Sequence, residues 1–449
     1  MRTTFASLRF HNYRLWFFGA MVSNIGAWMQ RVAQDWLVLT VLTHESGAAV
    51  GAVTGLQFLP ALILGPWAGV LADRVNQRRL LYATQAASAA LALGLGLLVV
   101  LGHVELWHVY VFAGLLGCST ALDAPVRQIF VASLVPASHL PNAVALNSAS
   151  FNTARLIGPA VAGLMIAWVG TGWVFLANAL TFTATIAALL ALRPSEIASP
   201  KRALRAPGQM RAALTYVRGR ADIVVIMATV GVVSTFGLNL QLTSALMART
   251  EFGRGPGEYG LLGSVIAIGS LAGALLAARR KNPGVRIVIV SAFGFALAMG
   301  AMALAPTYLL YAIACVPVGF AALTMLTAAN ASIQTTTEPS MRGRVMALYI
   351  MVFLGATPLG SPFVGWIGDT FGARWAIGVG ALAALLVAIG AALWAMRHWN
   401  LEVTYHLHRP LLRVTSPRGR ASASAERAAR EEASLLIGQQ QIEDTATRA

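Results

Sequence analysis

Long runs of hydrophobic residues, separated by short polar loops, fill the chain from about Leu15 to about Met396. Twelve of these runs are long enough to cross a bilayer, which takes about 20 mostly apolar residues. Lipid offers the backbone no hydrogen-bond partner, so a spanning segment is either a helix or a strand of a closed barrel. The runs are continuous, whereas barrel strands alternate, so we predict an all-α membrane protein with twelve transmembrane helices. The predicted spans are 15–42, 48–72, 80–102, 106–127, 143–169, 173–192, 222–248, 258–278, 286–305, 308–335, 344–368 and 375–396.

Composition and charge agree with this class. Hydrophobic residues make up 57% of the chain and charged residues 11%, which excludes an ordinary soluble domain. Of the 33 lysines and arginines, 28 fall in the N-terminus, the even-numbered loops and the C-terminal tail, and two, Arg31 and Arg155, fall inside spans. The opposite loops hold three, which are Arg249, Arg254 and Arg374. This asymmetry predicts cytoplasmic termini, with Glu45 and Glu251 outside, and it explains the net charge of +16 without a nucleic-acid partner.

The cysteines and the N-terminus narrow the class further. Cys118 and Cys315 both fall inside predicted spans, so no disulfide framework, metal site or cofactor is expected. The first apolar run contains Gln30, Arg31 and Asp35 and has no small-residue cleavage site, so it is not interpreted as a signal peptide.

An internal repeat divides the chain into two halves. Residues of span 2 match residues of span 8 at an offset of 204, as in Gly65/Gly269 and Gly69/Gly273. Span 5 matches span 11 at an offset of 202, with the pairs Gly158/Gly360, Gly163/Gly365 and Gly170/Gly372. Both pairs run in the same direction through the membrane, which is the architecture of a secondary transporter with its site between parallel six-helix halves.

We therefore predict an N-terminal six-helix half at 1–192, a cytoplasmic linker at 193–221 and a C-terminal six-helix half at 222–397. From Gln209 the linker has an amphipathic pattern, which fits either an interfacial helix on the cytoplasmic leaflet or a solvated connection. Residues 398–449 form a polar tail that is predicted to be largely disordered, with a short helix near 424–437.

The most specific motif lies in the loop between spans 2 and 3. It reads Gly69-Val-Leu-Ala-Asp73-Arg74-Val-Asn-Gln-Arg78-Arg79. Gly65 and Gly69 share one helix face and permit close approach of a second helix, and Asp73 can bind an arginine or the N-terminus of a facing helix. The motif resembles the loop 2–3 signature of the major facilitator superfamily, which implies a latch that holds the cytoplasmic side closed. We assign Asp123 and Arg127, an i,i+4 pair at the cytoplasmic end of span 4, to the same gate.

A second motif, Arg155-Leu-Ile-Gly158-Pro159-Ala-Val-Ala-Gly163, lies in span 5. Proline removes a backbone donor and can kink a helix, while the glycines permit close packing beside the kink. The motif resembles the Gly-Pro antiporter motif of superfamily exporters and favours export over import. A packing kink without a role in coupling is the alternative.

Further resemblance covers most of the chain. The runs 24–36, 58–60, 123–128 and 142–147 look like the branch of the superfamily that contains the enterobactin exporter and related tetracycline and multidrug efflux proteins. That similarity implies proton-driven export of a small amphipathic molecule and leaves the cargo open.

Charged residues inside the spans mark a candidate site. Each costs on the order of 2.5–3.5 kcal/mol on insertion scales, so it normally faces a cavity or a partner. With 3.6 residues per turn, Asn24, Trp28, Arg31 and Asp35 share one stripe of span 1, and this stripe is expected to line the interior. Arg31 and Asp35 are either a structural ion pair or part of a proton-coupling site. The other candidates for the cavity are Asn152, Arg155, Asn239, Gln241 and Asn330.

Three functions compete. The first is a secondary transporter of the bacterial inner membrane that works as a monomer on a small-molecule substrate and protons, in export or in import. The second is a receptor or scaffold on a retained transporter fold, which would not need Asp73 or the charged stripe. The third, an intramembrane enzyme, has little support, since no Ser/His/Asp set, metal-ligand spacing or phosphate loop lies near a span.

Overall fold

The computed structural model describes residues 5–197, 209–278, 284–399, 402–405 and 412–415. Its α-helices are α1 (His11–Leu37), α2 (Gly47–Arg74), α3 (Gln77–Val100), α4 (Leu106–Ser133), α5 (Leu140–Val169), α6 (Thr171–Ala191), α7 (Gln209–Arg218), α8 (Ala221–Phe236), α9 (Leu240–Leu246), α10 (Pro256–Ala278), α11 (Val285–Ala303), α12 (Tyr308–Thr336), α13 (Pro339–Gly355), α14 (Thr357–Phe371) and α15 (Ala373–Trp399). Short helical turns cover Ala6–Arg9, Val38–Leu42, Ala137–His139, Pro194–Glu196 and Met247–Glu251, and the strands are β1 (Glu402–Tyr405) and β2 (Leu412–Thr415).

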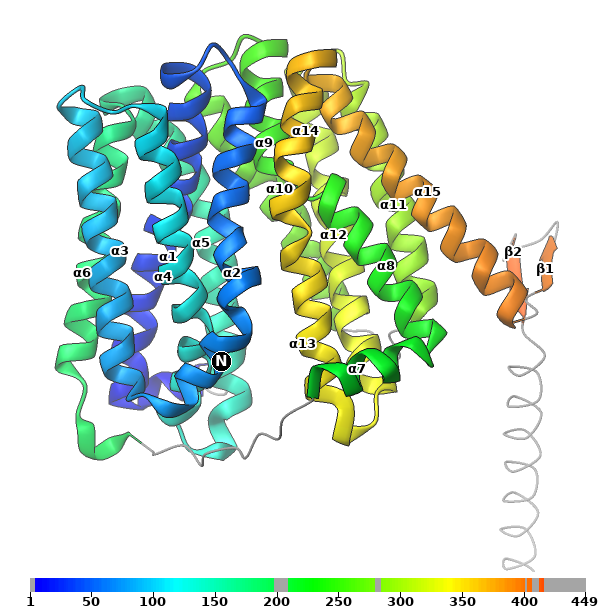
Figure 1. Ribbon diagram of the computed structural model, residues 1–449, viewed down its shortest axis with the longest axis horizontal. Coiled ribbons are helices and arrows are strands. Elements are labelled where there is room, and N and C mark those ends of the chain that lie inside the picture. Colours follow the sequence, from blue (N-terminus) through cyan, green and yellow to red (C-terminus); the bar gives the residue numbers. More distant parts are fainter. Residues whose placement is uncertain (1–4, 198–208, 279–283, 400–401, 406–411, 416–449) are drawn as a thin grey trace, which may run out of the picture. The chain divides into compact units, whose positions relative to one another are not determined.

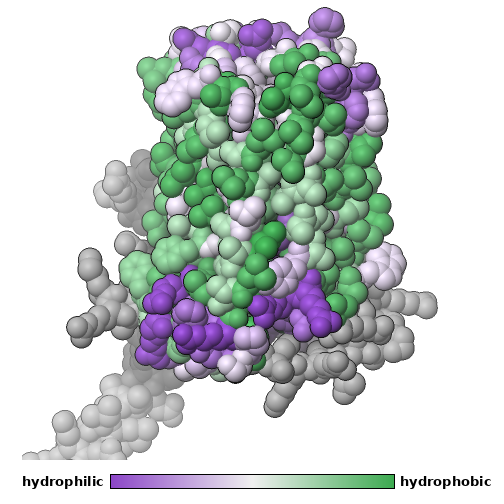
Figure 2. Space-filling view, turned by 90° about the vertical axis from the view of Figure 1, so that its left-hand side faces the viewer, coloured by the Kyte–Doolittle hydropathy of each residue, from purple (hydrophilic) through white to green (hydrophobic). Residues whose placement is uncertain are grey.

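The prediction of an all-α membrane protein is confirmed. Eleven stretches of the described chain are long and apolar enough to span a bilayer. The twelfth predicted span is α1, a 27-residue helix that is more polar because its last turns contain Gln30, Arg31, Gln34 and Asp35. Figure 2 shows hydrophobic side chains over the middle of one face of the molecule and hydrophilic residues gathered toward its two ends, as expected for a protein surrounded by lipid.

Two predicted spans are interrupted. Span 7 is divided into α8 and α9 at Gly237, and the Asn239 side chain donates a hydrogen bond to the carbonyl oxygen of Thr235 (2.8 Å), which the broken helix leaves free. Span 11 is divided into α13 and α14 beside Pro358, which has no backbone N–H to continue the helix.

Helices α1–α6, which we call the N-terminal half, pack side by side through the pairs α1/α6, α3/α6, α2/α4 and α1/α5 (Figure 1). Helices α8–α14 with the first part of α15 form the C-terminal half, in which α12 packs against both α10 and α11. Matching glycines occupy matching places in the two halves. A Cβ atom at Gly158 would lie 2.6 Å from Cβ of Trp28 on α1, and one at Gly360 would clash with the Thr235 backbone on α8. The predicted repeat therefore corresponds to equivalent helix contacts.

The two halves meet through the helix pairs α2/α14 and α5/α10. A Cβ atom at Gly163 would lie 2.5 Å from the carbonyl oxygen of Pro256, and one at Gly365 would clash with the carbonyl oxygen of Gly47. Both contacts lie toward the helix ends that carry Glu45 and Asp369. We call this the outer end, because the Lys/Arg asymmetry predicts that it faces outward.

Helix α7 lies in the predicted linker and packs against α13 and α8, with Ala213 and Val217 buried. Arg220 follows it and binds Asp222 through two hydrogen bonds, of 3.0 and 2.8 Å. Hydrogen bonding to the Asp222 carboxylate raises the pKa of the Arg220 guanidinium. This ion pair fixes the start of α8, the first helix of the C-terminal half.

The described residues up to Val387 form one compact unit, and the described residues from Ala388 onward belong to a second. In the second unit β1 and β2 pair antiparallel, with Glu402 opposite Thr415. The sequence analysis did not predict this hairpin. The helix predicted near 424–437 lies outside the described residues, and the division at 192, 221 and 397 stays a prediction.

Candidate functional site

The charged stripe of α1 faces α5 at Trp28. The guanidinium carbon of Arg31 lies 4.9 Å from the centroid of the Trp28 ring, and that of Arg155, on α5, lies 5.8 Å from it. Gly158 permits this arrangement, because it lets α5 approach Cβ of Trp28 and the carbonyl oxygen of Ile25 closely. Asn24, Trp28, Arg31, Asn152 and Arg155 are all half-buried, so solvent reaches part of the stripe.

Asp35, one turn beyond Arg31, is 3% exposed. The hydroxyl of Tyr259, on α10 of the other half, donates a hydrogen bond to Oδ2 of Asp35 (3.2 Å). The Tyr259 ring stacks on Trp36, with 5.7 Å between the ring centroids. Asp35 is therefore part of a contact between the two halves. Tyr259 was not predicted from the sequence, because no local spacing connects residues 224 positions apart.

Arg31 and Asp35 form no ion pair within the described part of the chain, although they are four residues apart. The Arg31 guanidinium instead lies over two aromatic rings, those of Trp28 and Phe58, the latter at 5.5 Å. Arg155 likewise has an aromatic neighbour, and neither arginine donates a hydrogen bond to another described residue.

The polar candidates of the C-terminal half differ in their surroundings. Asn239 is buried, accepts a hydrogen bond from Ser361 Oγ (2.6 Å) and donates one to Thr235, so its amide is occupied by the break between α8 and α9. Asn330 accepts a hydrogen bond from Gln334 one turn later on α12. Asn330 and Gln241 are both half-buried. Asn239 thus has a structural use, whereas the other two side chains remain partly accessible.

The predicted cytoplasmic gate is described in part. Helix α2 includes Gly69, Asp73 and Arg74, but the surroundings of these three residues are outside what the structure describes. Arg78 donates two hydrogen bonds to the carbonyl oxygen of Leu189 on α6 (3.0 and 2.7 Å), while Arg79 is exposed. These contacts lie within the N-terminal half.

Asp123 has three partners. It accepts hydrogen bonds from Thr84 Oγ1 (2.7 Å) and Gln85 Nε2 (2.9 Å) on α3, and it forms an ion pair with Arg127. Arg127 in turn lies over the Trp16 ring, 5.5 Å from its centroid. This network fastens α1, α3 and α4 to one another at the predicted cytoplasmic end.

The Gly-Pro motif lies where α5 meets α10. Pro159 is inside α5, and its carbonyl oxygen would clash with a Cβ atom at Gly260. Ser264 Oγ donates a hydrogen bond to the carbonyl oxygen of Leu156 (2.5 Å) beside the proline. Together with the contact of Gly163 to Pro256, these interactions place Pro159 and Gly163 at the junction of the halves, while Gly158 packs against α1.

A second junction closes the outer end between α14 and α2. The Asp369 carboxylate accepts hydrogen bonds from Ser46 Oγ (2.9 Å) and from the backbone N–H groups of Gly47 (2.5 Å) and Ala48 (3.0 Å). A carboxylate at a helix N-terminus satisfies free N–H groups and complements the helix dipole. The sequence analysis missed Asp369, although Gly365-x-x-x-Asp369 repeats the Gly69-x-x-x-Asp73 spacing. We call Asp369 and its three donors the outer latch.

Ion pairs surround the outer latch. Arg249 binds Glu45 at 2.8 Å, and Arg374 binds Glu251 at 2.5 Å. Arg374 also donates hydrogen bonds to the carbonyl oxygens of Ala303 (3.0 Å) and Ala305 (2.8 Å). The Arg249–Glu45 pair joins the two halves, and the Arg374 contacts hold the C-terminal half together at the same end.

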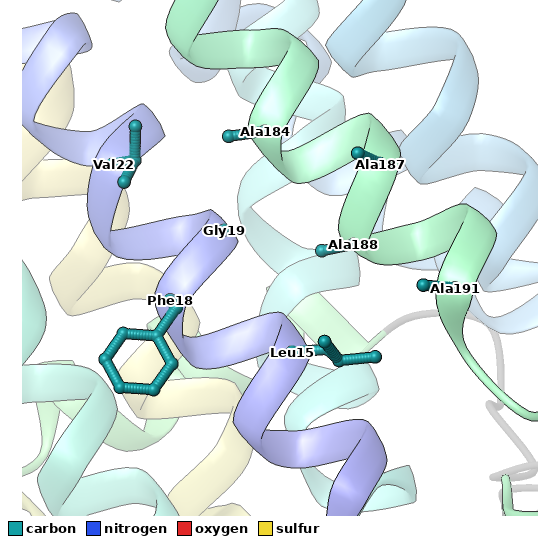
Figure 3. A pocket seen from close by; sticks show the side chains of 8 residues that line it. All are labelled: Leu15, Phe18, Gly19, Val22, Ala184, Ala187, Ala188 and Ala191. Carbon is teal, nitrogen blue, oxygen red and sulfur yellow. The ribbon is translucent and has the colours of Figure 1, made fainter.

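An apolar groove of about 380 Å³ lies between α1 and α6 (Figure 3). Its lining residues are Leu15, Phe18, Gly19, Val22, Ala184, Ala187, Ala188 and Ala191. The groove presents no charged or hydrogen-bonding side chain, so it offers nothing to orient a polar substrate. Among the described residues, no group of three His, Cys, Asp or Glu side chains could hold a metal ion.

Residues 2–432 match the family model described as transmembrane secretion effector. The chain is 25% identical to the Staphyloferrin A transporter of Staphylococcus aureus over 368 residues, which cover 80% of this chain and 90% of that protein. It is 28% identical to the multidrug efflux pump Tap of Mycolicibacterium fortuitum, with 79% and 88% covered. It is 25% identical to the enterobactin exporter EntS of Shigella boydii, with 74% and 78% covered.

A solved structure shares the fold. A bacterial homologue of the human lysosomal transporter Spinster, in an inward-facing and occupied conformation, has a TM-score of 0.67 and 16% identity, with 86% of this chain and 97% of that chain covered. The predicted resemblance to the enterobactin exporter branch is thereby confirmed at the level of family and fold.

Proposed function

Because the chain belongs to the transmembrane secretion effector family of the major facilitator superfamily, we propose that it exports a small amphipathic molecule in exchange for protons. It is a multi-pass membrane transporter and not an enzyme. Transporters of this architecture bind substrate near the bilayer midplane and expose it to each side in turn. We place the chain in the bacterial inner membrane with both termini in the cytoplasm, and as a monomer, since one chain supplies both halves.

The proposal of proton coupling rests on the hydrogen bond between Asp35 and Tyr259. This bond joins α1 to α10, so it forms only while the halves meet at the outer end. When the halves separate there, the Asp35 carboxylate loses its partner and meets outside water, with which it exchanges a proton. Closure returns the carboxylate to Tyr259 and excludes that water, so proton binding and the position of the halves depend on each other.

The direction of transport rests on two supports. The Gly-Pro motif of α5 lies at the junction with α10, where a change of helix packing alters access from outside. Relatives with up to 28% identity are named as an efflux pump and as an exporter, and their names refer to drugs and a siderophore. We therefore propose that the cargo is drug-like or siderophore-like.

Inverted membrane vesicles test the proposal. With an acidic lumen, wild-type protein should accumulate at least one member of a panel that contains a drug-like cation, a neutral amphiphile and a siderophore-like chelator. Asp35→Asn should bind cargo and equilibrate it but fail to accumulate it, because the proton site is lost. Tyr259→Phe keeps the ring on Trp36 and removes the hydroxyl donor, so it should show weaker accumulation for the same pH gradient.

Glu196→Gln is the matched control, because it removes an exposed carboxylate that pairs with Arg193 outside the spans. It should behave as wild type. If Asp35→Asn accumulates cargo with unchanged pH dependence, the carboxylate is structural and coupling must reside elsewhere, with Asp123 the next candidate. Uptake into the cytoplasm in place of efflux would reverse the proposed direction, and the absence of any transport would favour a receptor or scaffold.

A further inference from the structure

Two arginines beside Trp28 form no ion pair with another residue of the described chain. Arg31 and Arg155 lie on neighbouring helices, and both guanidinium groups are within 6 Å of one indole ring, at 4.9 and 5.8 Å. Within the described residues neither arginine forms an ion pair, and neither donates a hydrogen bond. Asp35, the acidic side chain nearest to Arg31 along α1, accepts its hydrogen bond from Tyr259.

The charges of this cluster do not cancel. Two guanidinium groups face at most one negative charge, that of Asp35, so the cluster keeps a net positive charge in either protonation state of the carboxylate. A guanidinium in a spanning segment is costly unless an anion or water compensates it. Each guanidinium also presents N–H donors in a fork that matches a carboxylate or phosphate. The cluster is therefore complementary to an anion.

The cluster lies on the predicted cytoplasmic side of the buried contact between the halves. Arg31 and Arg155 are half-buried, whereas Asp35 and Pro159, one turn nearer the outer end, are buried in contacts between the halves. Arg155 is near the middle of the 30-residue helix α5, and a rise of 1.5 Å per residue puts it about 20 Å from either end. A lipid headgroup, which stays at the membrane surface, does not reach that depth unless a lipid enters between the halves.

We propose that Arg31 and Arg155 bind an organic anion, and that the cargo of this transporter is an amphipathic molecule with at least one carboxylate or similar oxyanion. The guanidinium groups bind the oxyanion, while the rings of Trp28 and Phe58 contact an apolar or aromatic part of the same molecule. This inference rests on the proposed export function and names its substrate class. An anion that leaves and a proton that enters both move in the direction that an inside-negative membrane potential favours.

Binding to purified full-length protein in phosphatidylcholine nanodiscs tests the inference. The probe is benzene-1,3,5-tricarboxylate, and its trimethyl ester is a neutral molecule of nearly the same shape. The tricarboxylate should raise the unfolding temperature of the wild type at millimolar concentration, and the ester should not. Arg31→Gln and Arg155→Gln should each weaken binding about 10-fold or more, because each removes charge-assisted hydrogen bonds.

Three controls sharpen the result. Arg193→Gln removes an exposed arginine at the cytoplasmic end and should leave the affinity unchanged. Arg155→Lys keeps the positive charge but loses the planar set of guanidinium donors, so it should lose less affinity than Arg155→Gln. It replaces Arg155→Gln in the measurement if the glutamine variant fails to fold. Replacing part of the lipid by anionic phosphatidylglycerol should leave tricarboxylate binding intact, whereas displacement would identify a lipid headgroup as the ligand.

Equal binding of acid and ester, unchanged affinity in both arginine variants, or no binding of the tricarboxylate by the wild type would each overturn the inference. The export proposal is measured separately, by gradient-driven accumulation in inverted vesicles. If a neutral or cationic cargo is accumulated and the anion is not bound, the assignment of an anionic cargo is wrong and the export function stands. If the anion binds in the expected way but nothing is accumulated, the export function is wrong.

Discussion

Replacing Asp369 by asparagine should shift the transporter toward a conformation that is open at the outer end. The carboxylate accepts hydrogen bonds from Ser46, Gly47 and Ala48 across the junction of the two halves. Asparagine has one acceptor oxygen, and its NH₂ group would face backbone N–H donors. The substitution therefore removes the charge and at least one of the three hydrogen bonds without changing the shape of the side chain.

The size of the effect follows from the exposure of the site. A hydrogen bond to a charged group contributes about 1.5–3 kcal/mol when shielded from water, and a charge at a helix N-terminus contributes about 0.3–1 kcal/mol. Asp369 is exposed, so screening reduces both contributions. We expect a loss of about 1–2 kcal/mol, which changes the ratio of the two conformations about 5–30-fold.

Distances between spin labels measure this shift. One pair, at His44 and Phe371, reports the outer end, and a second pair, at Arg79 and Ser340, reports the other end; all four side chains are exposed. In Asp369→Asn the outer pair should gain a population at longer distance and the second pair a population at shorter distance.

Two substitutions serve as controls for this measurement. Asp369→Glu retains the charge and Thr370→Ala changes the exposed neighbour, so both should resemble the wild type. Unchanged distance distributions in Asp369→Asn would refute the view that the outer latch holds this end closed.

The remaining predictions concern packing, stability and topology. Gly365→Ala should also open the outer end, because its Cβ atom would clash with the carbonyl oxygen of Gly47. Gly300→Ala should not open it, because nothing lies within 4 Å of a Cβ atom at that position. The same spin-label pairs measure both variants. Asp123→Ala should lower the free energy of unfolding by about 3 kcal/mol, since it leaves the half-buried Arg127 and the buried Gln85 amide without their acceptor. Thermal unfolding measures the loss, and an unchanged stability would return Asp123 to a purely gating role. In a cysteine-free background, a cysteine at position 45 should react with an impermeant reagent added outside and one at position 205 should not, and the opposite result would invert the topology.

The membrane spans could be predicted from the sequence because membrane insertion depends on the composition of each segment. Each helix must satisfy its own backbone and present apolar side chains to lipid, and both properties belong to about 20 consecutive residues. The charged helix α1 was predicted as a span because its long apolar run continues around Arg31 and Asp35, which share one stripe. The breaks at Gly237 and Pro358 were not predicted, because a break inside a span is tolerated only where other helices satisfy the freed groups.

The part of the candidate site on α1 was predicted from sequence periodicity. The stripe of Asn24, Trp28, Arg31 and Asp35 was predicted from a period of 3.6 residues, and α1 places Trp28 and Arg31 together as expected. Periodicity carries no information on which other helix faces the stripe. Arg155 meets the same indole ring only because Gly158 lets α5 approach α1 at that level.

By itself, the sequence determined the class of the protein, its twelve spans, its predicted sidedness and the residues that carry charge into the membrane. Only the tertiary structure decided the partners of those charges. Tyr259 binds Asp35 across 224 residues, and Asp369 binds the N-terminus of α2 across more than 320 residues. Such contacts depend on the mutual position of whole helices, which is fixed by the summed packing of many small residues and not by any local pattern.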